Sequence, residues 1–360
     1  MFRQFLKEIH WPILFLALLL TSMGIMAIYS ASFRNADAYA AKQLFWLLIG
    51  FGVFFATVWI GYRSFLNISY VLYVLGLGML VWVLVFGESH AGAQRWISVG
   101  SFQLQPSELA KMATILMLSK FLSDQSPFLV QKRTLLGAIL FAGVPAFLVL
   151  KQPDLGTALV FIPILFGMIF LWGVRIRYLI GLFLTGILSL PFLWSALKPY
   201  QQKRLLVFFN PSIDPIGASY TAIQSKIAVG SGGLFGKGWL QGTQTQLDFV
   251  PEHHTDFIFT VLAEEFGFLG SVFLILVFAA LAVYVFRIIY QTTDLRARLL
   301  ALGVISYFIF QIFVNMGMTI GLAPITGITL PFISYGGSSL VINFFAFGLL
   351  VSIYKERSIF

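Results

Sequence analysis

The sequence contains no cysteine and has few charged residues. Without cysteine the chain has no disulfide framework, no thiol nucleophile and no thiolate metal site. Only 10% of its residues are charged, whereas an ordinary soluble domain has about 25%. The 23 basic and 14 acidic residues are too few to cover the surface of a soluble chain of 360 residues, so a water-soluble protein is excluded.

Apolar residues dominate what is present. They make up 59% of the chain, against about 45–50% in a soluble domain, and aromatic residues alone make up 17%. This content is too high for a disordered chain, and no short repeat of a fibrous protein runs through the sequence. The composition therefore predicts a polytopic, all-α membrane protein.

Ten apolar runs are separated by polar segments, and roughly 20 apolar residues are needed for a helix to cross a membrane. We therefore predict ten transmembrane helices in a single membrane domain over residues 1–360, with a large outer loop at about 198–256 between the seventh and eighth helices. The expected spans are 12–30, 44–61, 67–86, 107–122, 135–150, 157–174, 178–197, 257–286, 299–320 and 338–354.

Basic residues are distributed unevenly between the two sides that these spans define. An even number of spans puts both termini on one side, where thirteen Lys and Arg residues fall, starting with Arg3 and Lys7. The short connections on the opposite side hold four, so the positive-inside rule predicts that both termini are cytoplasmic. The net charge of +9 is then a topology signal. We expect no nucleic-acid partner, because the basic residues form no cluster on a polar domain.

Acidic residues show the reverse distribution. Ten of the 14 lie in outer loops or in the outer halves of spans. The positive-inside rule gives little weight to acidic residues, so this asymmetry needs another cause. A functional surface on the outer face is the candidate.

The outer connection at 198–256 is far longer than the usual connection of about 4–6 residues. Its amphipathic stretches at 205–209 and 220–229 are expected to form short helices at the membrane interface. The glycine-rich run at 230–238 is not a nucleotide-binding loop, because its glycine spacing fails and Gly238 stands where Ser or Thr would bind magnesium. It is either a flexible loop or a backbone cradle for a diphosphate on another molecule.

Asp256 follows Thr255 where this connection enters the eighth span. Such a pair commonly caps a helix N-terminus. The alternative is a carboxylate held at the membrane face as a general base or a metal ligand. His253 and His254 are expected to pack rather than to bind a metal, because adjacent side chains point apart and no HExxH spacing is present.

Charged residues also occur inside predicted spans. Glu264 and Glu265 lie two turns into the eighth span, and at least one must face the protein interior or a wet cavity, because a lipid-facing carboxylate is costly. Glu108 and Lys111 are three residues apart in the fourth span, close enough to neutralise each other. They form either a buried ion pair that fixes helix packing or the polar floor of a cavity that opens outward.

Two further segments have chemistry suited to an outward-facing site. Arg95, next to Trp96, offers a cation beside an aromatic ring, which suits a phosphate or a sugar. Residues 315–339 are rich in Gly, Pro, Ser and Thr. They either allow close helix packing or form irregular backbone that lines a cavity.

Six segments of the chain resemble the SEDS family (shape, elongation, division and sporulation), which includes RodA and FtsW. These segments are 95–111, 152–158, 209–215, 224–244, 249–270 and 315–339. They cover nearly the whole outer half of the protein. The short tails and compact length are more similar to the RodA branch.

The resemblance implies a peptidoglycan glycosyltransferase that polymerises lipid II on the outer face of the bacterial cytoplasmic membrane. It implies about ten spans, a large fourth outer loop and a single essential aspartate, which falls on Asp256. It also implies a class B penicillin-binding protein as partner, supplying the transpeptidase, and a role in the elongation machinery. Activity in the family depends on a divalent cation, Mg²⁺ or Mn²⁺, whose ligands in this chain are unknown.

The residues and the resemblance together predict one reaction. Asp256 acts as general base on the 4-hydroxyl of the acceptor N-acetylglucosamine, which attacks the anomeric carbon of the donor with inversion. Cationic groups offset the charge that develops on the lipid diphosphate. The predicted substrate-binding residues are Arg95, Glu108, Lys111, Arg204, Lys226 and Lys237.

A lipid II flippase or transporter without glycosyl transfer is the alternative function, and a scaffold that only recruits the partner synthase is a third. A transporter would need polar sites on both faces and commonly has an inverted repeat. The sequence shows no convincing internal repeat, and its cytoplasmic side has little besides basic topology signals. The enzyme is therefore the favoured prediction.

Overall fold

A computed structural model describes residues 10–33, 39–90, 93–99, 102–125, 132–217 and 219–357. Nearly all of this part is helical, and each predicted span corresponds to one helix. These ten helices are α2 (Trp11–Ser32), α3 (Tyr39–Ile60), α5 (Ser69–Phe86), α6 (Pro106–Ser123), α7 (Lys132–Lys151), α8 (Leu155–Trp172), α9 (Ile176–Ala196), α13 (Ile258–Gln291), α14 (Leu295–Ile320) and α15 (Gly337–Arg357). The multi-pass helical membrane fold is confirmed.

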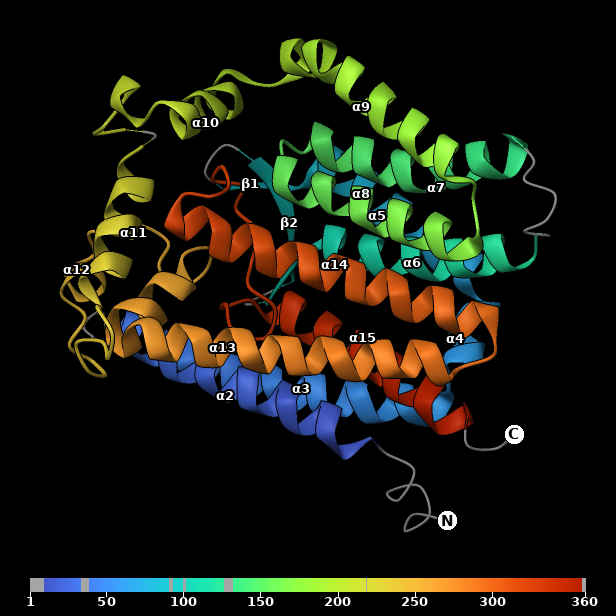
Figure 1. Cartoon of the computed structure of the whole chain (residues 1–360), viewed down its shortest axis with the longest axis horizontal. Coiled ribbons are helices and arrows are strands. Elements are labelled where there is room, and N and C mark those ends of the chain that lie inside the picture. Colours follow the sequence, from blue (N-terminus) through green and yellow to red (C-terminus); the bar gives the residue numbers. More distant parts are fainter. Residues whose placement is uncertain are drawn as a thin grey trace.

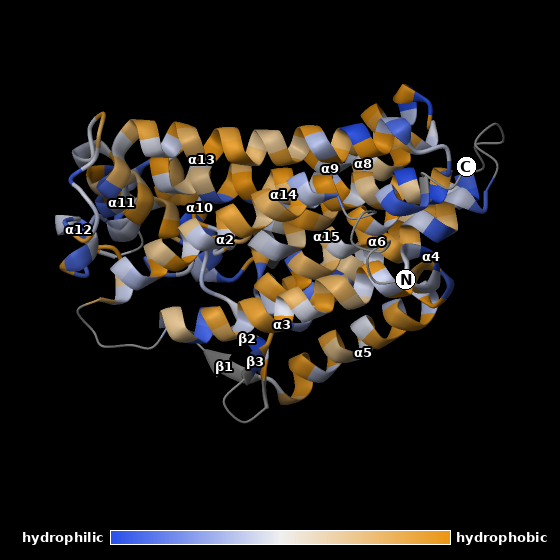
Figure 2. Ribbon diagram, turned by 90° about the horizontal axis from the view of Figure 1, so that it is seen from below, coloured by the Kyte–Doolittle hydropathy of each residue, from blue (hydrophilic) through white to orange (hydrophobic). Residues whose placement is uncertain are grey.

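Eight of the described helices are long and apolar enough to cross a membrane. The other two predicted spans are α6, which contains Glu108 and Lys111, and α9, in which the described residues Ile176–Phe192 form a shorter apolar helix. The count of ten spans therefore stays a prediction. Apolar residues run along the length of the long helices, and hydrophilic residues gather toward their ends (Figure 2).

The bundle has two distinct ends. The start of α2, the end of α15 and the short helix α4 (Tyr62–Asn67) lie together at one end (Figure 1). The opposite end carries the long outer connection, with α11 (Tyr220–Ser231) and α12 (Thr243–Gln246). This arrangement agrees with an even number of crossings. Arg3 and Lys7, which begin the topology count, lie outside the described residues.

The long connection contains short helices, as its amphipathic stretches predict. They are α10 (Pro199–Phe209), the 3₁₀ helix η1 (Pro211–Ile213), α11 and α12. By contrast, the connection before α6 forms a small sheet that the sequence analysis does not foresee. Its antiparallel strands lie in the order β1 (Glu88–His90), β2 (Ala93–Val99) and β3 (Phe102–Leu104). Arg95 lies on the central strand, β2.

Two glycines let the irregular segment between α14 and α15 pack against helices. A Cβ on Gly24 of α2 would lie 2.6 Å from the carbonyl oxygen of Ile333. A Cβ on Gly156 of α8 would lie 2.6 Å from the carbonyl oxygen of Thr326. Small residues therefore give the close approach that was one of the two interpretations of this region.

Helix α13 is interrupted at Gly267, whose φ of 65° and ψ of −157° are not helical. The interruption leaves the carbonyl oxygens of Glu264 and Glu265 without helical partners, and the glycine-rich run supplies the donors. The N–H of Lys237 bonds the carbonyl oxygen of Glu264 and the N–H of Gly238 that of Glu265, each at 3.0 Å. These bonds meet the requirement that backbone groups at membrane depth be paired within the protein.

The same run also accepts hydrogen bonds from the far side of the interruption. Phe268 donates its N–H to the carbonyl oxygen of Gly233 at 2.8 Å, and Leu269 donates to that of Leu234 at 3.1 Å. Close backbone approach requires glycine here, because a Cβ on Gly236 would lie 2.1 Å from the carbonyl oxygen of Glu265. The glycine-rich run is therefore an inserted, hydrogen-bonded loop rather than a flexible one.

Replacing Gly236 should strongly destabilise the fold. Gly236→Ala puts a Cβ into the Glu265 carbonyl at a φ of 82°, so we expect a loss of about 3 kcal/mol from overpacking and left-handed strain. The midpoint of thermal unfolding in detergent should fall. The control is Gly78→Ala, where nothing lies within 4 Å of the added Cβ. Equal midpoints for the two variants would contradict the inserted loop.

Candidate active site

Asp256 lies in the turn before α13 and does not cap it. The helix begins at Ile258, its N-cap position is Phe257, and no side chain makes a capping hydrogen bond. The N-cap interpretation of Asp256 is therefore wrong, because the helix begins one residue later than such a cap requires. Its carboxylate is free of that structural role.

The backbone at Asp256 is fixed by α14. The side-chain amide of Asn315 donates to the carbonyl oxygen of Asp256 at 2.8 Å and to that of Ile328 at 2.7 Å. Gly327, with a φ of 73°, lies against the carboxylate, since a Cβ there would be 3.2 Å from Asp256 Oδ2. The irregular segment after α14 thus forms one wall beside Asp256.

The environment of Asp256 disfavours its ionised form. The Asp256 residue is partly exposed, but the protein around its carboxyl excludes much of the water. This desolvation raises the pKa of the carboxyl to about 6, and the nearby charges of Glu252 and Asp154 raise it as well. Arg204 and Arg95 oppose them and lower the pKa. A carboxylate with a pKa near 6 is mostly ionised at neutral pH and basic enough to accept a proton.

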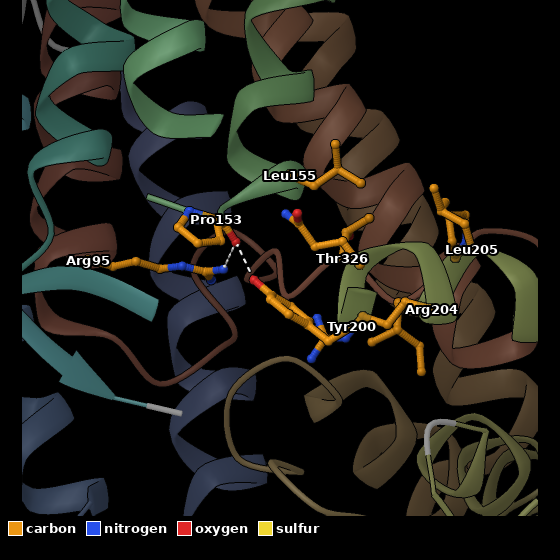
Figure 3. A pocket seen from close by; sticks show the side chains of 10 residues that line it. Arg95, Pro153, Leu155, Tyr200, Arg204, Leu205 and Thr326 are labelled. Atoms are coloured by element: carbon orange, nitrogen blue, oxygen red, sulfur yellow. Dashed lines mark hydrogen bonds between the residues drawn. The ribbon is translucent and has the colours of Figure 1, made fainter. Parts of the chain in front are cut away.

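Asp154 links α8 to the strand that carries Arg95. It caps α8 by accepting from the N–H and the hydroxyl of Thr157 at 3.1 and 2.9 Å. It is only 1% exposed, and its Oδ2 lies 3.6 Å from Nη1 of Arg95. Arg95 also donates to the carbonyl oxygen of Gln152 and to that of Pro153 (Figure 3). The sequence places Asp154 among the outer acids but gives no sign of its pairing with Arg95.

Helix α10 brings Arg204 close to Pro153, in the turn before α8 that Arg95 also contacts. The hydroxyl of Tyr200 donates to the carbonyl oxygen of Pro153 at 2.9 Å, and the Arg204 guanidinium lies 5.8 Å from the Tyr200 ring centre. Arg95 and Arg204 therefore line one small cleft (Figure 3). Its lining residues are Arg95, Pro153, Leu155, Tyr200, Gln201, Arg204, Leu205, Pro324, Ile325 and Thr326. The irregular segment after α14 thus lines a cavity as well as packing closely, so both interpretations of it hold.

Glu108 and Lys111 form a buried ion pair and are not among the residues that line this cleft. Lys111 Nζ lies 2.8 Å from Glu108 Oε1, and the two side chains are 1% and 4% exposed. The ammonium also lies 5.0 Å from the ring centre of Tyr307, whose hydroxyl donates to Asn343 at 2.6 Å. These contacts match the packing interpretation of the pair, and neither residue lines the cleft. A role in substrate binding stays a prediction.

Lys237 and Lys226 also lie outside the cleft lining. Lys237 Nζ bonds Glu264 Oε1 and Thr243 Oγ1, each at 2.7 Å. Lys226 is exposed on α11, with its side chain against Gly321. The backbone amides of Lys237 and Gly238 are bonded to α13, so these two N–H groups are not available to a diphosphate. Of the six predicted substrate-binding residues, the structure brings Arg95 and Arg204 together beside Asp256.

Both acidic residues in α13 are buried, as predicted for at least one of them. The Glu264 carboxylate accepts from the N–H groups of Gln244 and Thr245 at 2.8 and 3.0 Å, in addition to Lys237. Glu265 accepts from the hydroxyl of Ser30 and from the N–H of Leu240. These two carboxylates therefore hold the outer connection onto α13.

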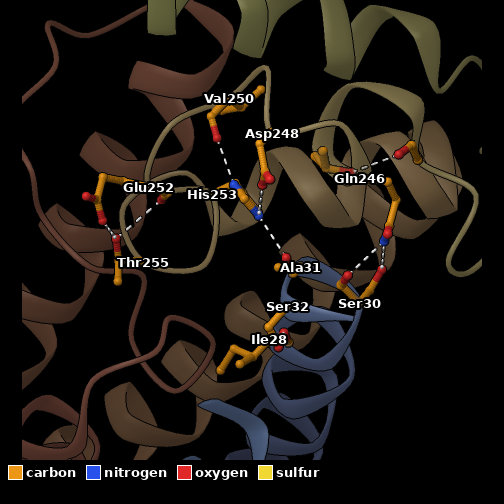
Figure 4. A network of polar contacts seen from close by, with 12 residues as sticks. Ile28, Ser30, Ala31, Ser32, Gln246, Asp248, Val250, Glu252, His253 and Thr255 are labelled. Carbon is orange, nitrogen blue, oxygen red and sulfur yellow. Dashed lines mark hydrogen bonds and ion pairs between the residues drawn. The ribbon is translucent and has the colours of Figure 1, made fainter. Parts of the chain in front are cut away.

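The two histidines pack as predicted. The ring nitrogens of His253 lie 2.8 Å from the carbonyl oxygens of Val250 and Ala31 (Figure 4). His254 stacks on Tyr39 with ring centres 4.7 Å apart. Within the described ranges, no three His, Cys, Asp or Glu side chains come together in a group that could hold a metal. A divalent cation would therefore need donors beyond these side chains.

Comparison with known proteins connects this geometry to a family. A family model described as "cell cycle protein", built on FtsW, RodA and SpoVE, matches residues 10–359. The chain is 41% identical over 289 residues to the peptidoglycan glycosyltransferase MrdB of Escherichia coli K12, which covers 79% of this chain and 77% of MrdB. It is 33% identical to the peptidoglycan glycosyltransferase RodA of Treponema pallidum over an alignment covering 98% of both chains.

A solved structure has the same fold. A chain from a peptidoglycan synthase complex, studied for the coordination of polymerisation and crosslinking, superimposes with a TM-score of 0.84 at 31% identity. The alignment covers 97% of this chain and 98% of that chain. The likeness therefore includes the outer connections as well as the long helices.

Removing the Glu264 carboxylate should loosen the segment around α12. Glu264→Ala deletes the acceptor of the Gln244 and Thr245 amides. Their hydrogen exchange should accelerate about tenfold or more, since hydrogen bonds to charged groups contribute about 1.5–3 kcal/mol. Exchange is measured by mass spectrometry on peptides that cover 243–247. Asp214→Ala, in the same outer connection, should leave these rates unchanged, and equal protection in both variants would refute the anchoring role.

Proposed function

The chain belongs to the SEDS family of peptidoglycan glycosyltransferases, and from this premise we propose that it polymerises lipid II with Asp256 as general base. One observation carries the proposal. The carboxyl of Asp256, whose pKa is about 6, lies in the electrostatic field of Arg95 and Arg204, and both arginines line the adjacent cleft. A base and a pair of cations are what transfer of a sugar from a diphosphate requires.

Asp256 accepts the proton of the 4-hydroxyl on the acceptor N-acetylglucosamine as that oxygen attacks the anomeric carbon of the donor. The bond from this carbon to the diphosphate oxygen breaks, and the lipid diphosphate leaves. Arg95 and Arg204 offset the negative charge that develops on it. A diphosphate needs no strong general acid, because it is already a good leaving group.

The stereochemistry favours a base over a nucleophile. The donor is α-linked to its diphosphate and the glycan product is β-linked, so one displacement inverts the anomeric carbon. A covalent glycosyl intermediate on Asp256 would need two displacements and would give retention. The role of Asp256 is therefore to hold and remove a proton.

A divalent cation, Mg²⁺ or Mn²⁺, is part of the proposal. An anionic diphosphate entering the cleft adds negative charge to the field of Glu252 and Asp154 around Asp256, which raises the pKa of the base further. Positive charge that arrives with the diphosphate offsets this effect. The described side chains do not form a metal group by themselves, so we propose that the diphosphate supplies some of the ligands.

The reaction is proposed for the outer face of the bacterial cytoplasmic membrane, because β2 and α10, which carry Arg95 and Arg204 of the cleft, lie at the end of the bundle opposite α4 (Figure 1). A class B penicillin-binding protein of the elongation machinery would crosslink the product, which fits the structural likeness to a chain from a synthase complex. The flippase alternative is not favoured, since the relatives are named glycosyltransferases.

Removing the base should abolish polymerisation. Asp256→Ala and Asp256→Asn should each lower the rate by about 10²–10⁴-fold, the usual contribution of a positioned base. The purified protein is incubated with its partner synthase, lipid II and Mg²⁺ or Mn²⁺, and glycan products are resolved on a gel. Chelating the cation should also stop product formation. Wild-type rates for Asp256→Ala would disprove the assignment, and Asp256→Asn separates loss of charge from loss of shape.

The rate of polymerisation should depend on pH through Asp256. The base must be ionised, so activity should rise with pH and reach half its maximum near the pKa of about 6. Arg204→Gln removes a charge that lowers this pKa, so the midpoint should move to higher pH; Glu252→Gln should move it to lower pH. Midpoints are read from rates between pH 5 and 9. If the midpoints of Arg204→Gln and Glu252→Gln moved in the same direction, the opposite effects of these two residues on Asp256 would be contradicted.

A further inference from the structure

A second cavity lies on the side of the bundle between α3 and α5. Helix α5 stands apart from α3 (Figure 2), and the groove between them has about 850 Å³ of empty space. Its floor is formed by α6 and α15, with Met112, Leu116 and Phe345 among the lining residues. Leu75 and Met79 of α5 form one wall. Every side chain that lines the groove is apolar.

The groove has a cation at one mouth. Phe65 of α4 lines it at the end of the bundle that carries the start of α2 and the end of α15. Lys120 is one helical turn beyond Leu116 on α6 and so lies on the same face of that helix. Its ammonium donates to the carbonyl oxygen of Asn67 at 3.2 Å and lies 5.1 Å from the ring centre of Tyr70.

The ammonium of Lys120 has N–H donors left to bind an anion. An ammonium has three N–H donors, and the Asn67 carbonyl takes one of them. In the ranges that the structure describes, no carboxylate lies within 4 Å of Lys120 Nζ. Tyr70, which is 45% exposed, supplies the kind of aromatic ring that lies at the headgroup level of a membrane.

We infer that this groove binds an anionic phospholipid, with an acyl chain between α3 and α5 and the phosphate at Lys120. The apolar groove matches the acyl chain of such a lipid, and the cationic mouth matches its phosphate. The mouth is at the end predicted to be cytoplasmic, where anionic lipids attract lysine and arginine. The inference does not depend on the proposed function, because none of these residues takes part in it.

The size of the groove favours an acyl chain over a helix. A helix with its side chains is about 10–12 Å wide, so one turn occupies roughly 400–600 Å³. The groove therefore has room for about two turns of helix at most, far less than a membrane span requires. An extended hydrocarbon chain is narrower and can follow the groove toward Val341 of α15.

The test is native mass spectrometry of the detergent-solubilised protein after incubation with equal amounts of phosphatidylglycerol and phosphatidylcholine. We expect one phosphatidylglycerol to be retained at least tenfold more often than phosphatidylcholine. Lys120→Gln should reduce this preference to below twofold, because it removes the headgroup charge. Lys132→Gln removes a basic residue at the start of α7 and should leave the preference intact.

A second pair of variants tests the groove itself. Leu75→Trp fills it and should abolish retention of both lipids, whereas Val74→Trp, on the same helix but outside the lining, should retain phosphatidylglycerol. Thermal melting checks that each variant is folded; if Leu75→Trp fails this check, the Lys120 pair still decides. Equal retention of both lipids by the wild-type protein, or unchanged retention in Leu75→Trp, would overturn the inference.

Discussion

The hydrogen bonds between the glycine-rich run and the interrupted turn of α13 are the constraint on which the outer half of the protein depends. A membrane helix cannot leave its carbonyl and amide groups unpaired, so the break at Gly267 requires a second segment at this depth. Residues 233–238 supply it through four backbone bonds. The helical segment that begins at Ile258 is thereby fastened to the outer connection, and Asp256 is held at its start.

Several charged residues of the outer half fasten elements together. Lys237 pairs with Glu264, Lys203 with Asp214 and Arg95 with Asp154. The sequence places ten of its 14 acidic residues on this side, which indicates a functional surface there. The structure divides the charges of this side. The three ion pairs join segments within the protein, and the Lys111–Glu108 pair is buried within α6. Arg204 and the partly exposed Arg95 line the cleft beside Asp256.

The long helices could be predicted because each needs a continuous apolar run, and a run of that length has few other uses. The sheet at residues 88–104 could not, because strands of three to seven residues with mixed polarity give little periodic signal. Asp256 was identifiable from a resemblance, yet its ambiguity with an N-cap needed the start of α13 to resolve it. The pairing of Arg95 with Asp154 joins residues distant in sequence, and spacing alone cannot show such a contact.

Gly24 and Gly156 do not line the cleft, yet both pack against the segment that forms one of its walls. Each lets a helix touch the backbone of the segment after α14, which carries Thr326 into the cleft and Gly327 against Asp256. The separation between Asp256 and the two arginines therefore depends on how closely α2 and α8 approach the segment after α14. Sequence changes in the lipid-embedded bundle can tune the width of the cleft without altering any residue that lines it.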